Sequence, residues 1–76
     1  MPRLPRVTGA ELTRLMEKQG FVFVRSRGSH HIFRHPESGR RVTIPVHSGK
    51  IIPPGTLLNI LREAGISREE LEDLLR

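Results

Sequence analysis

Three of the chain's four histidines lie within one short segment, from Arg25 to His35, that also carries several arginines. Histidine has an unperturbed pKa of roughly 6.5, so it can take or give a proton near neutral pH. Arginine presents a planar set of donors that suits the oxygens of phosphate. The segment therefore predicts that a phosphodiester backbone binds here and that one of the histidines transfers a proton to or from it.

The positive charge of the chain is concentrated around this segment. The net charge is +5 at pH 7 over 76 residues. The bases between residues 25 and 50 are Arg25, Arg27, Arg34, Arg40, Arg41 and Lys50, against the single acid Glu37. From residue 63 to residue 76 the acids outnumber the bases. A polyanion is thus expected to meet the middle of the chain.

Composition excludes several other classes of function. The chain has no cysteine, so disulfides, thiolate zinc sites and a catalytic thiol are excluded. A zinc site of His30, His31 and His47 is disfavoured, because no carboxylate and no helical spacing of histidines supports it. We expect no metal and no small-molecule cofactor. No apolar run approaches the ~20 residues that span a bilayer, so a cytoplasmic location without membrane contact is expected.

The elements that position the histidines can be read from spacing. Thr8 and Glu11 have the form of a capping box and open a helix over about residues 9–19. Residues 21–24 are aromatic and β-branched and predict a first strand, followed by strands over 30–35 and 40–46. A turn at 36–39 joins the last two strands. Residues 47–55 form a loop rich in glycine and proline.

Two further helices are predicted after this loop. The first covers residues 56–64, with Pro54 suited to its first turn. Ser67 and Glu70 repeat the capping-box pattern and open a short last helix. We therefore predict a single domain over residues 1–76, with residues 1–7 flexible. The fold class is α+β in the order α-β-β-β-α(-α), with a three-stranded antiparallel sheet and helices on one face. Double-stranded-RNA-binding domains share this architecture.

Strand geometry separates the neighbouring histidines. His30 and His31 point to opposite faces of the sheet, because strand side chains alternate. If Phe33 lies in the core, His30 is on the open face together with Ile32 and Arg34. Alternation alone does not decide which face of the strand is buried, since Ile32 is apolar too. His35 precedes a proline at a turn, and we expect it to be structural.

The remaining candidates follow the strands or precede them. His47 ends the third strand and is either a second proton-transfer group or a residue that caps the loop. Ser29 has no carboxylate near it in the sequence to orient a base, so a contact to phosphate is favoured over a nucleophilic role. Lys50 is a candidate phosphate contact or a solvated loop lysine.

Several short motifs resemble one protein family in their order along the chain. They are Thr8-Gly-Ala-Glu-Leu12, Gly20-Phe21, Arg27-Gly-Ser-His-His-Ile-Phe33, His35-Pro36, Val42-Thr-Ile-Pro-Val-His47, Gly55-Thr56 and Ile60-Leu61. Together they resemble the HicA-type (YcfA-like) toxins of bacterial toxin–antitoxin modules. The resemblance covers about residues 8–71. It implies an mRNA interferase with a double-stranded-RNA-binding-like fold, neutralised by a HicB-type antitoxin. The family's essential histidine maps onto His30, or onto His31 if the motif is shifted by one position.

Together with the residues described above, this resemblance implies a metal-independent endoribonuclease. His30, or alternatively His31, would transfer a proton at an RNA 2′-hydroxyl, with His47 as a possible second group. The expected contacts to mRNA are Gly28, Ser29, Arg25, Arg27, Arg34, Arg41 and Lys50. The alternative function is a non-catalytic RNA-binding module that uses the same basic face. A third possibility is a structural or partner-binding domain in which the histidines have no chemical role.

Overall fold

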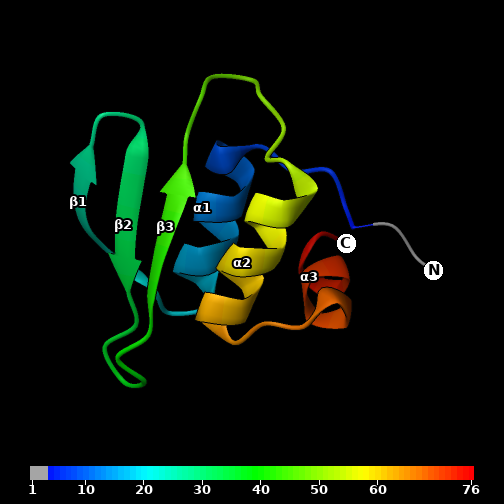
Figure 1. Cartoon of the computed structure of the whole chain (residues 1–76). Coiled ribbons are helices and arrows are strands. Elements are labelled where there is room, and N and C mark those ends of the chain that lie inside the picture. The colour runs from blue at the N-terminus through cyan, green and yellow to red at the C-terminus, as the bar shows by residue number, and fades with distance from the viewer. Residues whose placement is uncertain (1–3) are drawn as a thin grey trace.

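A computed structural model of the chain describes residues 4–76. The elements follow in the order α1 (Gly9–Lys18), β1 (Val22–Arg27), β2 (His30–Arg34), β3 (Arg41–Pro45), α2 (Pro54–Ala64) and α3 (Arg68–Leu74). The three strands form one antiparallel sheet in the order β1-β2-β3, and the helices lie on one side of it (Figure 1). The predicted fold class is therefore confirmed.

Local signals in the sequence explain where the helices begin and end. At α1 the Thr8 backbone N–H donates to the Glu11 carboxylate, and the Glu11 N–H donates to the Thr8 hydroxyl. Hydrogen bonds to the Glu11 carboxylate, first from the Thr8 backbone N–H and then from the Thr8 side chain, hold the pKa of Glu11 below its ordinary value. Ser67 and Glu70 make the same reciprocal pair at α3. Helix α2 starts at Pro54 and ends at Ala64, and it is capped by Gly65, whose φ of +74° is left-handed.

The hydrophobic core lies between the helices and the β2–β3 part of the sheet. Phe33, Val42 and Ile44 point from the strands into this core, and each is at most 1% exposed. They belong to one buried cluster with side chains of α1 and α2, including Leu12, Met16, Leu57 and Ile60. Strand β1 is the edge strand farthest from the helices (Figure 1), and its Val22, Phe23 and Val24 are exposed.

The segment before α1 packs against the fold. Of the residues expected to be flexible, 1–3 lie outside the described part of the chain. Val7 is 1% exposed, and its carbonyl accepts a hydrogen bond of 2.8 Å from the Ile52 N–H. Val7 thus completes the core and ties the segment to the loop before α2.

Gly9 fixes the start of α1 against the end of β3. A Cβ atom at this position would overlap the backbone carbonyl of Pro45 and crowd the Cα of Val46. Only glycine permits this approach, so the helix holds the end of β3 and the loop that follows it in place. Pro45 is the last residue of an edge strand, a position where the missing N–H of proline is tolerated. No helix within residues 4–76 is long and apolar enough to cross a membrane.

Candidate functional site

The two neighbouring histidines of β2 lie on opposite faces of the sheet. Phe33 is buried and pairs with buried Val42, so this face of β2 is the one under the helices. His31 lies on the same face, opposite Ile44, and is half-buried. His30 is exposed and lies on the open face. The face predicted for His30 is the one observed.

Four of the predicted arginines lie on the open face with His30. The strand pairing places Arg27 opposite His30, Arg25 opposite Ile32, and Arg34 opposite Arg41. Residues directly opposite each other in an antiparallel pair share a face. All four arginines are exposed. The open face therefore combines one histidine with four guanidinium groups, while no acid lies on any of the three strands.

A β-bulge in β1 is responsible for the positions of two of these arginines. The register shifts between Phe23 and Arg25, so Val24 is the extra residue. Phe23 lies opposite Phe33 on the helix-side face, and strict alternation would put Arg25 and Arg27 on that face too. The bulge reverses the alternation and turns both arginines to the open face. The sequence contains no glycine or proline in β1 that would have indicated this bulge.

Arg40, which belongs to the same basic stretch of sequence, has a structural role. Its guanidinium Nη1 donates to the backbone carbonyl of Glu63, 3.2 Å away, near the end of α2. The guanidinium also lies against Gly65, where a Cβ atom would displace it. Arg40 thus satisfies a free carbonyl of the last helical turn, where the helix dipole favours a cation.

The turn between β1 and β2 brings Ser29 to the end of β3. Gly28 has a φ of +58° at the first position of this two-residue turn, as in a type II′ hairpin. The Ser29 carbonyl accepts a 2.7 Å hydrogen bond from the Val46 N–H. The Ser29 hydroxyl lies 3.4 Å from Nε2 of His47. Two segments separated by 18 residues are thereby joined next to His30.

His30, His47 and Lys50 line one hollow in the surface. The hollow has a volume of about 270 Å³ and is completed by Pro45, Ile51, Ile52, Pro53 and Thr56. A tight turn over residues 47–50 places Lys50, because its N–H donates to the His47 carbonyl at 3.0 Å. Two imidazoles, one of them on the arginine face, and one ammonium group can thus act on a single bound group. This arrangement suits proton transfer at a phosphate and stabilisation of its charge.

The fourth histidine, His35, is held by the fold at the opposite end of β2. Its Nδ1 accepts from the backbone N–H groups of Glu37 (3.2 Å) and Ser38 (3.3 Å), so the proton is on Nε2. That Nε2–H donates to the Gln19 carbonyl at 3.1 Å, and the ring packs edge-on against Phe21. All hydrogen-bonding positions of the ring are used, so His35 is structural, as expected.

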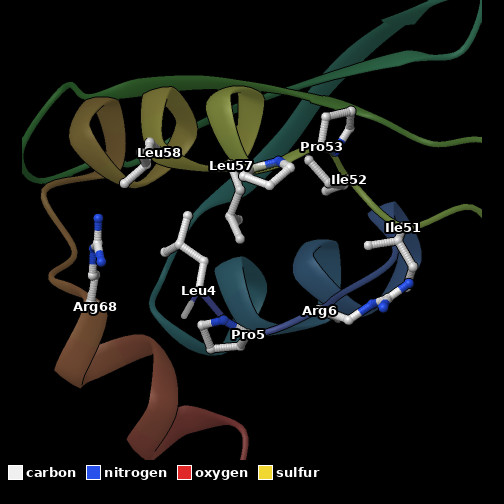
Figure 2. Close-up of a pocket in the computed structure, with 10 residues that line it drawn as sticks. Leu4, Pro5, Arg6, Ile51, Ile52, Pro53, Leu57, Leu58 and Arg68 are labelled. Carbon is white, nitrogen blue, oxygen red and sulfur yellow. The ribbon is translucent and has the colours of Figure 1, made fainter. Parts of the chain in front are cut away.

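A second, larger hollow lies beside the first and has a different character. Its volume is about 510 Å³, and its lining is mostly apolar, including Leu4, Pro5, Leu57 and Leu58 (Figure 2). Arg6 and Arg68 lie on opposite sides of it, and no histidine lines it. A choice by volume alone would take this hollow as the functional site. Of these two hollows, however, the smaller one is lined by histidines and the larger one is not.

The structure brings together most of the predicted site residues. His30, Ser29, Arg25, Arg27, Arg34 and Arg41 lie on or beside the open face, and His47 and Lys50 join His30 at the hollow. His31 lies on the other face, where its ring contacts Phe23 at a centroid distance of 5.8 Å. Within residues 4–76, no three His, Cys, Asp or Glu side chains are grouped so that they could hold a metal ion.

These features define the chain as a small α+β protein with a basic, histidine-bearing sheet face. A sequence model of one protein family, described as the HicA toxin of bacterial toxin–antitoxin systems, matches residues 9–66. The match covers all three strands, α1 and α2. The chain belongs to the HicA toxin family, whose members are paired with a HicB antitoxin. No curated protein sequence matches the chain.

Proposed function

We propose that this HicA-family toxin is a metal-independent endoribonuclease that cleaves mRNA and thereby stops translation. The observation that supports the proposal most strongly is the exposure of His30 among four arginines, at the edge of a hollow that it shares with His47 and Lys50. An open cationic face of this kind suits the binding of a long polyanion.

In the proposed reaction the RNA supplies its own nucleophile. His30 takes the proton of a ribose 2′-hydroxyl, and the 2′-oxygen attacks the adjacent phosphorus. The bond from phosphorus to the 5′-oxygen breaks, and a proton supplied by the second group, for which we propose His47, neutralises the leaving oxygen. The products are a 2′,3′-cyclic phosphate and a 5′-hydroxyl. A positioned acid or base contributes about 10²–10⁴-fold to such a reaction.

The cationic groups have two separate tasks in this proposal. The four arginines of the open face bind phosphates along the RNA and fix its position without recognising its base sequence. They are Arg25, Arg27, Arg34 and Arg41. Lys50 faces the hollow and stabilises the charge that builds up on the reacting phosphate. The hydrogen bond between Ser29 and His47 orients the second imidazole. Gly28 and Ser29 offer backbone and hydroxyl donors at the tip of the hairpin.

The antitoxin is proposed to cover the basic face. An acidic surface on the HicB partner would be steered to the four arginines and would exclude RNA from His30. Histidine modification by diethylpyrocarbonate can test this arrangement. We expect His30 to react in the free toxin and to be protected in the complex. If the complex protected RNA while His30 still reacted at its free rate, simple occlusion would be wrong.

The proposed chemistry is tested by the products formed from a long unstructured RNA in the presence of EDTA. We expect fragments that end in 2′,3′-cyclic phosphate and begin with a 5′-hydroxyl, at a rate unaffected by the chelator. Tight binding without cleavage would support the RNA-binding module instead. If the protein neither binds nor cleaves the RNA, the result would support a domain that only binds a protein partner.

A further inference from the structure

The hollow beside His30 contains a wall that the proposed phosphate chemistry does not use. Beyond the two histidines and Lys50, its lining consists of Pro45, Ile51, Ile52, Pro53 and Thr56. A phosphate gains nothing from proline rings and isoleucine side chains, because a charged group is disfavoured next to apolar surface. The wall therefore indicates a ligand group that is apolar on its faces and is attached to the phosphate.

A nucleobase has this character. It is flat, its faces stack on apolar or aromatic side chains, and its edge carries hydrogen-bonding groups. Pro45, Pro53 and Ile51 offer the apolar surface, and the half-buried Thr56 offers one hydroxyl that can donate or accept. The volume of about 270 Å³ is below the roughly 300–1,000 Å³ of pockets for drug-sized ligands, so it suits one base and not a longer segment.

We infer that this hollow binds one unstacked base of single-stranded RNA, next to the phosphate on which His30 acts. The inference rests on the proposed function for the identity of the substrate. A base that is paired in an A-form helix is stacked inside the duplex, and it would have to leave the helix to enter the hollow. The substrate is therefore unpaired RNA, although the fold resembles domains that bind duplexes.

Binding of a base can be measured without any cleavage. The probes are the four nucleoside 3′-monophosphates, titrated against the full chain with ¹³C-labelled isoleucine methyl groups, and inorganic phosphate serves as the control ligand. We expect at least one nucleotide to shift the methyl signals of Ile51, which is exposed at the hollow, while those of buried Ile60 stay in place. If no nucleotide shifts Ile51, or if phosphate shifts it equally, the inference is overturned.

The variant Thr56→Val tests whether the hydroxyl contacts the edge of the base. It keeps the shape of the side chain and removes its hydrogen bond, so the affinity for the preferred nucleotide should fall about two- to tenfold. The matched control is Thr43→Val, which changes an exposed threonine on the open face of β3, outside the hollow. Equal affinities in the two variants for all four nucleotides would overturn the role assigned to Thr56.

The outcome separates this inference from the proposed nuclease activity. If nucleotides shift Ile51 but RNA is not cleaved, the base site stands and the proposed chemistry falls. If RNA is cleaved but no nucleotide shifts Ile51, only the base site falls. If the protein cleaves RNA, cleavage of one RNA can be compared in two forms. The RNA should be cut when it is single-stranded and should not be cut when it is annealed to its complement. Equal cleavage of both forms would contradict the requirement for an unpaired base.

Discussion

One histidine begins strand β2 and another directly follows its end, and the fold treats the two residues differently. At the far end, His35 is fixed by three hydrogen bonds and by the ring of Phe21. At the near end, His30 is exposed, faces a hollow, and has Arg27 opposite it. A histidine is available for chemistry when the fold leaves its ring nitrogens without hydrogen bonds. Two histidines that are close in the sequence can differ in this respect.

Arginines follow the same division between the two ends. Arg40 lies near the His35 end and donates to a carbonyl at the end of α2. Arg27 lies at the His30 end, exposed on the open face. The charges that appear as one basic stretch in the sequence are thus divided by the structure into groups that stabilise the fold and groups that can meet a ligand.

The largest effect is expected from His30→Ala. Loss of the group that takes the 2′-hydroxyl proton should lower the rate of RNA cleavage by about 10²–10⁴-fold. Because His30 is exposed, its replacement should change the free energy of unfolding by no more than about 0.5 kcal/mol, which shifts the melting temperature by at most about 2–4 °C. Single-turnover cleavage and thermal melting check both parts. The matched control is His31→Ala, on the other face of the same strand, which should keep its activity when folded. If His31→Ala instead abolished cleavage, the active histidine would have been assigned to the wrong face.

A smaller loss is expected from His47→Ala. This change removes the proposed second proton-transfer group but leaves His30 and the arginine face intact, so cleavage should slow by about 10²-fold, the lower end of the range for such a group. Ser48→Ala, in the neighbouring exposed loop position, is the control and should be neutral. Equal rates for the two variants would leave His47 without a chemical role.

At His35, which follows β2, we expect a loss of stability without a loss of activity. His35→Ala removes the hydrogen bond to the Gln19 carbonyl and the edge-on contact with Phe21, so the free energy of unfolding should fall by about 1–3 kcal/mol. For a domain of this size, 1 kcal/mol lowers the melting temperature by about 4–8 °C. Cleavage per folded molecule should be unchanged at low temperature. A variant that melts normally but cleaves poorly would contradict the structural role of His35.

The smallest effect is expected from single arginines. Arg27→Ala should weaken RNA binding a few-fold. The slope of the logarithm of the binding constant against the logarithm of the salt concentration should become less steep by about 0.7, as for one lost phosphate contact to a single strand. Arg40→Ala removes the same charge at the His35 end, where it should lower stability and leave the salt dependence close to that of the wild type. Binding isotherms at three salt concentrations would distinguish the two variants, and identical slopes would show that the face is irrelevant.

Much of this architecture could be predicted from local patterns. Capping boxes at Thr8 and Ser67 are local signals, and each predicted the start of its helix correctly. The face of His30 could be predicted only on the condition that Phe33 is buried, because Ile32 is also apolar. The resemblance to HicA toxins rested on short motifs in order, and the family match confirms it.

The remaining features depend on contacts between distant segments, which no local pattern encodes. The bulge at Val24 turns Arg25 and Arg27 to the open face, yet the residues of β1 would fit a regular strand equally well. The approach of His47 to Ser29 depends on Gly9 holding the end of β3. Val7 lies in a segment rich in proline and arginine, and its burial follows from the pairing of that segment with the loop before α2.

The central claim is that the His30 end of the sheet cleaves RNA through the RNA's own 2′-hydroxyl. The most direct test uses a short unstructured RNA in which the cleavage site has been mapped and only the nucleotide on its 5′ side is replaced by a 2′-deoxynucleotide. We predict that cleavage at that bond disappears, while the modified RNA still binds and is still cut at other sites. Cleavage of the modified bond at the rate of the unmodified one would contradict the claim.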